Sequence, residues 1–170
     1  MFNYSICKVH SQEHTAVISL IGRLRNFLGR FTINQQPDWQ MTDARTLMLD
    51  LKIALSTEII EHFDFEEKEL FPILEREGYA DMVEILQSDH DLIRSLARQV
   101  SVVIEKIAWG SRPLDKSDWE ILFRQGNVLI TELSGHVEKE EAGMLPALDQ
   151  VLDSESSEQM MREHQKSGTR

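Results

Sequence analysis

Two stretches of the sequence, residues 62–72 and 136–146, repeat the pattern His-x3-Glu-Glu-x3-apolar-Pro. A histidine and a glutamate four residues apart lie on the same face of an α-helix, so an imidazole nitrogen and a carboxylate oxygen can bind the same ion. Such ligands suit iron, manganese or zinc, and helical bundles build metal sites from side chains that point inward from facing helices. The pattern predicts two metal-binding pairs, which are His62 with Glu66 and His136 with Glu140.

Two further histidines lie on apolar helical faces. His14 shares its predicted face with Val17, and His90 shares its face with Ile93. An imidazole in a protein core needs a polar partner, because burying an unpaired polar group is costly. Taken alone, such a histidine is more often a hydrogen-bonded core residue than a metal ligand. One turn before His14, His10 could be a surface residue, a gate or an extra ligand, and we favour the surface.

Four segments carry apolar residues at three- and four-residue steps, which predicts four helices and an all-α protein. The expected helices span about residues 7–31, 43–72, 81–108 and 117–140. Pro72 is expected to end or kink the second of them, because proline lacks a backbone N–H and clashes with the preceding turn. We expect one bundle over residues 1–152 and a polar C-terminal tail over residues 153–170 that frays.

Each predicted helix contributes one histidine, and the second and fourth helices also contribute a glutamate. The order of candidate ligands in the second half of the chain therefore repeats the order in the first half. His14 and His62 are 48 residues apart, and His90 and His136 are 46 residues apart. Two such helix pairs, related by a pseudo-twofold axis, would bring six ligands together in the bundle interior. Six ligands are too many for one tetrahedral zinc and suit two metals that share two bridging carboxylates. The alternative is that each helix buries its histidine by chance, which is less favoured because buried glutamate is rare unless paired or coordinated.

The composition limits the classes of partner. A length of 170 residues suits a single domain with one core. The formal net charge of −11 argues against nucleic acid, because binding to phosphates needs clustered Lys and Arg. Cys7 is the only cysteine, so no intramolecular disulfide is expected. Without an apolar run of about 20 residues or a secretory signal, we expect no membrane partner and a cytoplasmic location.

With this repeated phrase and the two lone histidines, the chain resembles the hemerythrin-like, or HHE cation-binding, domain from His14 through Pro146. The resemblance implies an up-down-up-down four-helix bundle with a non-heme di-iron centre, in which two iron ions share an oxo or hydroxo bridge. Manganese or zinc is also compatible with the ligand types. The resemblance implies terminal ligands at His14, His62, His90 and His136, and bridging carboxylates at Glu66 and Glu140.

Two positions differ from the oxygen-carrying hemerythrins. Those proteins have a fifth histidine four residues after the third-helix ligand and an aspartate five residues after the fourth-helix histidine, where this chain has Arg94 and Glu141. We therefore do not expect reversible oxygen carriage. The ligand set is closest to the bacterial repair-of-iron-centres proteins and to hemerythrin-like sensors. The repair proteins commonly carry an N-terminal cysteine-bearing domain, and we expect no counterpart of it here, because few residues precede His14.

Some carboxylates are candidates to orient the ligands. A ligating histidine usually donates its second ring N–H to a carboxylate or carbonyl, which fixes the tautomer. Glu58 and Glu132 lie one turn before His62 and His136, and they are the favoured candidates for this role. The carboxylates immediately before the lone histidines are weaker candidates, because adjacent helical residues point about 100° apart. These weaker candidates are Glu13 and Asp89.

The functional prediction is a di-iron protein that binds or reacts with nitric oxide, oxygen or peroxide in an iron, nitrosative or oxidative stress response. One alternative is a sensor module in which metal occupancy or oxidation is read by a partner. Another is an iron donor or storage protein without catalytic turnover. The sequence leaves open whether the protein is an enzyme and which small molecule it binds, and it allows a homodimer.

Overall fold

The computed structural model describes residues 2–109 and 114–167. Helices α1 (Ser5–Leu28), α2 (Thr42–Ile53), α3 (Ile59–Phe65), α4 (Phe71–Arg76), α5 (Ala80–Trp109), α6 (Lys116–Lys139), α7 (Leu145–Val151) and α8 (Ser154–Ser167) follow one another along the chain. No β-strand occurs within the described residues. The protein is an all-α bundle, as the periodicity predicts.

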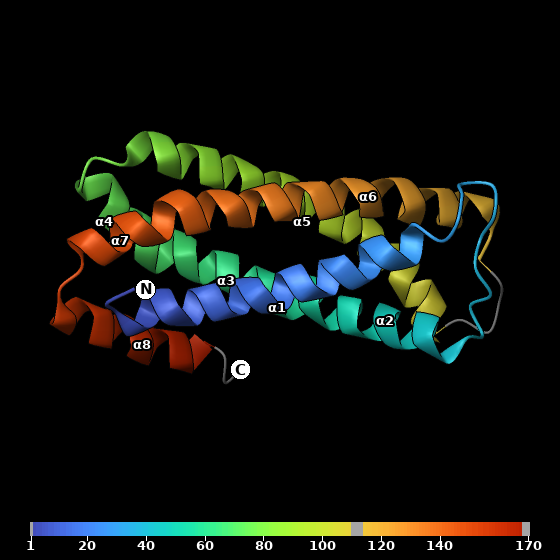
Figure 1. Cartoon of the computed structure of the whole chain (residues 1–170), viewed down its shortest axis with the longest axis horizontal. Helices are drawn as coiled ribbons and strands as arrows, with labels where there is room; N and C mark the ends of the chain where they lie inside the picture. The colour runs from blue at the N-terminus through green and yellow to red at the C-terminus, as the bar shows by residue number, and fades with distance from the viewer. Residues whose placement is uncertain (1, 110–113, 168–170) are drawn as a thin grey trace.

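Four long rods make up the bundle and run alternately up and down (Figure 1). The rods are α1, the joined helices α2 to α4, α5, and the joined helices α6 and α7. Helix α5 packs against α6 and α2, while α1 packs against α6 and α2 from the other side. The rods therefore enclose a common interior toward which one stripe of each helix points.

Short π-helical segments join the pieces of the second and fourth rods. The segments η2 (Glu66–Leu70) and η3 (Glu140–Met144) begin at the glutamates of the two repeated phrases. In each, the backbone N–H of the residue before the proline donates to the carbonyl five residues back, which is that of Glu66 or Glu140. This wider turn accommodates a proline that would clash in a regular helix. Of the two expectations for Pro72, that it ends the helix is wrong, because the rod continues through α4 to Arg76. The helix departs from regular α geometry at this proline, in the π segment η2.

A third π segment, η1 (Ala54–Glu58), joins α2 to α3 without a proline. The second rod then stops at Gly78, whose φ of 92° is the left-handed conformation that glycine adopts readily. The following turn leads directly into α5. This sharp reversal brings the N-terminal part of α5 alongside the two phrases.

Two apolar clusters fill the bundle. One lies toward the loop end and includes Leu24, Met48 and Trp119, whereas the other lies toward the opposite end and includes Phe71 and Leu148. Buried polar residues occupy the intervening positions on all four rods. They are His10, His14, Glu66, His90, His136 and Glu140. Such a layer of buried polar groups inside an apolar core is costly unless the groups bind each other or an ion.

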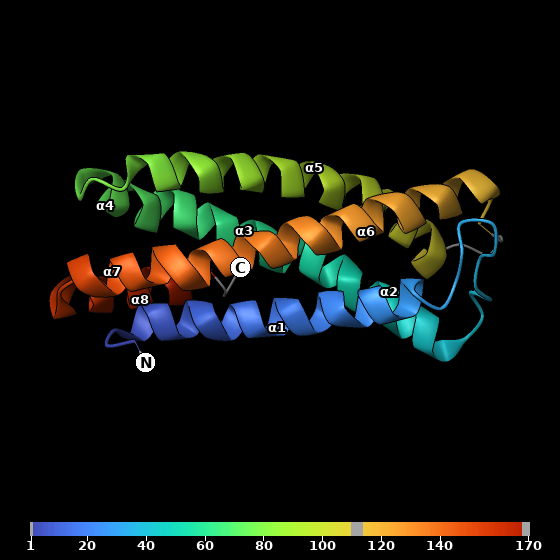
Figure 2. The ribbon, with the colours of Figure 1, turned by 45° about the horizontal axis from the view of Figure 1, so that its top comes forward.

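The C-terminal segment differs from the expectation of a fraying tail. Residues Ser154–Ser167 form helix α8, which packs along the N-terminal half of α1 and also contacts α3. Both views place it at the end of the bundle where α4 and α7 lie (Figures 1 and 2). Ser157 and Met160 are buried there. Residues 168–170 of the predicted tail lie outside the described residues, and the division of the chain at residue 152 stays a prediction.

No helix within residues 2–109 and 114–167 combines the length and the apolar character that crossing a bilayer requires.

Candidate metal centre

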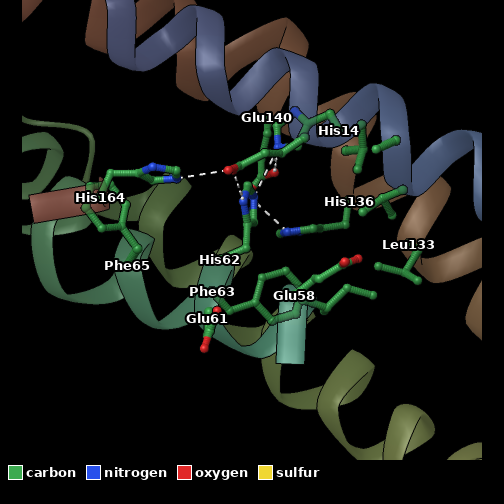
Figure 3. Close-up of a pocket in the computed structure, with 15 residues that line it drawn as sticks. His14, Glu58, Glu61, His62, Phe63, Phe65, Leu133, His136, Glu140 and His164 are labelled. Atoms are coloured by element: carbon green, nitrogen blue, oxygen red, sulfur yellow. Dashed lines mark hydrogen bonds and ion pairs between the residues drawn. The ribbon is translucent and has the colours of Figure 1, made fainter. Parts of the chain in front are cut away.

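The six side chains predicted as metal ligands converge at mid-bundle. They form two overlapping groups, and within each group one ligand atom per residue lies within 4.8 Å of all the others. The first group is His14, His62, Glu66 and Glu140, and the second is Glu66, His90, His136 and Glu140. Figure 3 shows His14, His62, His136 and Glu140 pointing toward one another from three different rods. The two groups share both glutamates.

The histidines approach each other in pairs through their Nε2 atoms. The Nε2 atoms of His14 and His62 are 3.2 Å apart, and those of His90 and His136 are also 3.2 Å apart. Each pair joins a lone histidine from one helix to the histidine of a repeated phrase on another. The two halves of the chain thus build equivalent pairs, as the sequence repeat predicts.

Each shared carboxylate presents one oxygen to each histidine pair. Glu66 Oε1 lies 3.1 Å from His62 Nε2, and Glu66 Oε2 lies 3.3 Å from His90 Nε2. Glu140 Oε2 lies 3.0 Å from His14 Nε2, and Glu140 Oε1 lies 3.0 Å from His136 Nε2. Two carboxylates that each face both pairs have the arrangement of bridging ligands between two ions.

The outer nitrogen of every ring faces a different carboxylate. His62 Nδ1 lies 2.9 Å from Glu13 and His14 Nδ1 lies 2.8 Å from Glu141. The other two rings repeat the arrangement, with Nδ1 of His90 2.7 Å from Glu67 and Nδ1 of His136 3.4 Å from Asp89. Because an ionised carboxylate only accepts hydrogen bonds, each Nδ1 carries the proton and donates. When a metal ion displaces the proton from Nε2, each ring would present its Nε2 lone pair to the interior, as metal-ligating histidines do.

Without a proton or a metal ion between them, the four Nε2 atoms and the carboxylate oxygens would be acceptors that face acceptors. All four oxygens of Glu66 and Glu140 are buried and have no hydrogen-bond partner among residues 2–109 and 114–167. Facing lone pairs and two nearby carboxylates repel one another unless a cation lies between them. The donor set of imidazole nitrogen and carboxylate oxygen fits iron, manganese and zinc. The buried side chains present here therefore fit a metal site.

Protons compete with a metal ion for the candidate ligand atoms of this site. Burial and the charge of Glu140 would raise the pKa of Glu66, but His62 and His90 outweigh them and lower it to about 2. Burial opposes a charge on His90, but its contacts with Glu140 and Glu66 raise its pKa to about 9. The two carboxylates thus stay ionised at neutral pH and attract positive charge, whether it is a proton or a metal ion.

The carboxylates that support the rings are not the two that the sequence analysis favoured. In the described part of the chain, neither Glu58 nor Glu132 hydrogen-bonds to a histidine, and every Nδ1 of the four rings faces another carboxylate. The weaker candidates Glu13 and Asp89 hold two of the rings across helices. The other two supporting carboxylates, Glu67 and Glu141, were not predicted. Their signal is the second glutamate of each repeated phrase.

Arg94 occupies the position where oxygen carriers have a further histidine, and it supports the site indirectly. Its guanidinium donates to Glu67 Oε1 at 2.6 Å and to Asp64 at 3.1 Å. It also lies over the ring of Phe63, 5.5 Å from the centroid. Phe63 in turn stacks on His90 with centroids 3.8 Å apart. Arg94 thus fixes Glu67, and Glu67 fixes His90.

A cavity of about 410 Å³ reaches this centre between α1, α3 and α6. Its inner wall includes His14, His62, His136 and Glu140, and most of the remaining wall is apolar (Figure 3). Glu58 and Glu61 also line the cavity. Glu58 therefore forms part of the cavity wall and does not hold a histidine ring in place. The cavity gives a small molecule a route to the space between the histidine pairs.

The placement of His10 on the surface is wrong. His10 has no exposed surface at all, because the N-terminal part of α1 is covered by the bundle and by α8. Its ring lies 4.8 Å from that of His62 and 5.6 Å from that of His164 on α8. Burial, with the neighbouring charge of His62, lowers the pKa of His10 to about 4, so the ring is neutral at pH 7.

Helix α8 adds one more group to this region. His164 Nε2 lies 2.9 Å from Glu13 Oε1, while Glu13 Oε2 accepts from His62. A chain of three side chains therefore runs from α8 to one of the histidine pairs. No pattern in the sequence connects His164 with the site, because no helix was expected there.

A family model described as the Hemerythrin HHE cation binding domain matches residues 11–148. The matched segment spans the six converging residues and most of the chain, whereas His10 and His164 lie outside it. No curated protein matches the chain.

Proposed function

We propose, from the premise that this chain belongs to the hemerythrin HHE cation-binding family, that it holds two iron ions and uses them on a small molecule. The molecule is nitric oxide, oxygen or peroxide, and the setting is an iron, nitrosative or oxidative stress response in the cytoplasm. Each iron would have one histidine pair, with Glu66 and Glu140 as bridging ligands between the two. Iron in such a pair supplies redox chemistry and an exchangeable coordination position.

The single observation that carries this proposal is the orientation of the four rings. Every Nδ1 faces a carboxylate, and every Nε2 faces another Nε2 and a buried carboxylate oxygen. A core histidine that serves only packing needs one hydrogen-bond partner, not a second nitrogen directed at another imidazole and a buried carboxylate. Four such rings with two shared carboxylates support a two-metal site over a single metal, because each group of four provides a complete set of ligands.

The cavity favours a small uncharged ligand. Its walls are formed largely by apolar side chains, among them Ile59, Phe63 and Leu133. Apolar walls exclude large polar substrates and admit diatomic molecules and peroxide. Within this centre the chain's own residues orient the rings through Nδ1 and keep the two carboxylates ionised.

The experiment is an anaerobic titration of the iron-loaded protein with nitric oxide or hydrogen peroxide, followed by its visible spectrum and by consumption of the molecule. Repeated consumption with an added reductant would support an enzyme. A single stoichiometric change of spectrum would support the sensor alternative, and loss of iron to a chelator on reduction would support the donor or storage alternative. A protein that binds no iron would exclude all three.

A further inference from the structure

His10 is the buried polar residue that the six-ligand arrangement does not explain. Its side chain has no exposed surface. Neither Nδ1 nor Nε2 has a hydrogen-bond partner within residues 2–109 and 114–167. Burying an imidazole with both nitrogens unsatisfied is costly relative to burying an apolar side chain. A leucine at this position would be cheaper for packing alone.

The ring of His10 points at the centre. Its Nε2 lies 3.8 Å from Glu66 Oε1, which is the same oxygen that faces His62. This distance is too long for a hydrogen bond. Two atoms that each lie about 2.1 Å from one ion are separated by about 3.0 Å when adjacent and about 4.2 Å when opposite. The separation of His10 and Glu66 falls in that range, and His10, Glu13 and His62 each offer a ligand atom within 4.8 Å of the other two.

The opposite half of the bundle has no equivalent of His10. The residue one turn before His90 is Leu86, which is buried in the apolar cluster at that end of the bundle. The sequence repeat therefore breaks at this one position of the layer, with an imidazole in one half and an isobutyl group in the other. An extra nitrogen donor lies next to the His14 and His62 pair alone.

We propose that His10 is a third imidazole ligand of the metal held by His14 and His62, so that the two metals are unequal. The inference rests on the proposed two-metal function. The metal of His90 and His136 then has one protein ligand fewer and one more position for an exogenous molecule. The third ligand comes from the first helix, outside the segment that the family pattern covers.

The test compares the wild type with His10→Leu, which introduces the side chain found at the equivalent position of the other half. Protein loaded anaerobically with iron-57 is studied by Mössbauer spectroscopy, and iron release to a chelator is timed. Phe65→Leu is the matched control, because the ring of Phe65 packs 5.6 Å from that of His10 but offers no ligand atom. Circular dichroism checks that each variant is folded.

We expect two irons per chain in the wild type, in two distinct environments of equal intensity. In His10→Leu one of the two signals should change, and that iron should be released at least about tenfold faster, since even an outer partner of a ligand is worth that much. Phe65→Leu should resemble the wild type in both measurements.

Two outcomes would overturn the inference, and they differ in what else they overturn. If His10→Leu binds two irons with the spectrum and release rate of the wild type, His10 is no ligand and the proposed function stands. If the wild type binds no iron or only one, the proposed function fails together with the inference. Should His10→Leu not fold, a wild-type spectrum with two identical irons would still contradict the proposal.

Discussion

The Nε2 atoms of His90 and His136 lie 3.2 Å apart although the two residues come from different helices. His90 Nδ1 faces Glu67 and His136 Nδ1 faces Asp89, so both Nε2 atoms point into the same small volume. Glu66 and Glu140 add two buried negative charges to it. The close approach of these nitrogens and carboxylates is favourable only when positive charge lies between them.

Loss of one proposed ligand should remove metal without unfolding the bundle. His62→Ala and Glu140→Ala should each lower the iron content from two per chain to at most one, because each removes a donor atom from one or both groups. The helical content should stay the same, since the apolar clusters on either side are untouched. Iron analysis and circular dichroism are the measurements, with Glu58→Ala as the control. Two irons per chain in both ligand variants would show that the ligand set is wrong.

Loss of a supporting carboxylate should weaken metal binding without abolishing it. Glu13→Gln keeps the shape of the side chain but removes the charge that holds His62 Nδ1 at 2.9 Å. The metal affinity should fall by roughly 10–100-fold, as for other outer partners of ligating histidines. Competition with a chelator measures the affinity. Glu132→Gln, which alters a carboxylate one turn from His136 without a hydrogen bond to that ring, should leave the affinity unchanged, and an equal loss in both variants would contradict the account.

The metal-free and metal-loaded proteins should respond oppositely to pH between about 6.5 and about 9. The folded metal-free protein holds a proton on His90 more tightly than the unfolded chain does, because its pKa is raised from 6.5 to about 9. This stabilisation is complete below pH 6.5 and is lost as the pH rises through 9, which amounts to about 3 kcal/mol for His90 alone.

Metal binding instead requires deprotonated imidazoles, so the stabilisation by metal grows as protons leave. Thermal unfolding of both forms under argon at several pH values measures the difference. The metal-free midpoint should fall over this range, and the gap between the two midpoints should widen. Parallel curves for the two forms would mean that no proton is displaced by the metal.

Narrowing the cavity should slow the reaction of the small molecule at the centre without changing the metal content. Val17 lines the cavity wall and is half-buried, so Val17→Phe fills part of the route to the centre without touching a ligand. The reaction with nitric oxide or peroxide should slow severalfold at constant iron content. Stopped-flow absorbance measures the rate, and Ile18→Phe on the outer face of α1 is the control. An unchanged rate would show that the molecule enters by another path.

Much of the fold and the centre could be predicted from the sequence. Apolar periodicity predicts the four rods, and the repeated phrase predicts which side chains share a helical face, because both depend on spacing along one helix. The convergence of His14 and His90 with the two phrases was predictable for the same reason. Each lies on the apolar stripe that must face the interior.

The features that were missed depend on contacts between helices. Helix α8 was not expected because its polar sequence buries only a few side chains, such as Ser157 and Met160. Without α8 over this end of the bundle, nothing in the sequence indicated that His10 would be buried. The carboxylate that each Nδ1 selects also depends on how neighbouring rods are rotated, which spacing along one helix does not determine. Glu67 therefore went unnoticed beside Glu66, although both belong to the repeated phrase.

The most direct measurement is X-ray diffraction from crystals of the iron-loaded protein at the iron absorption edge. The account predicts two anomalous peaks per chain between Glu66 and Glu140, roughly 3.5–4 Å apart as in other two-metal sites. One peak should lie beside the Nε2 atoms of His14 and His62, and the other beside those of His90 and His136. A single peak, or none between the two glutamates, would contradict the central claim that these six side chains form a two-metal centre.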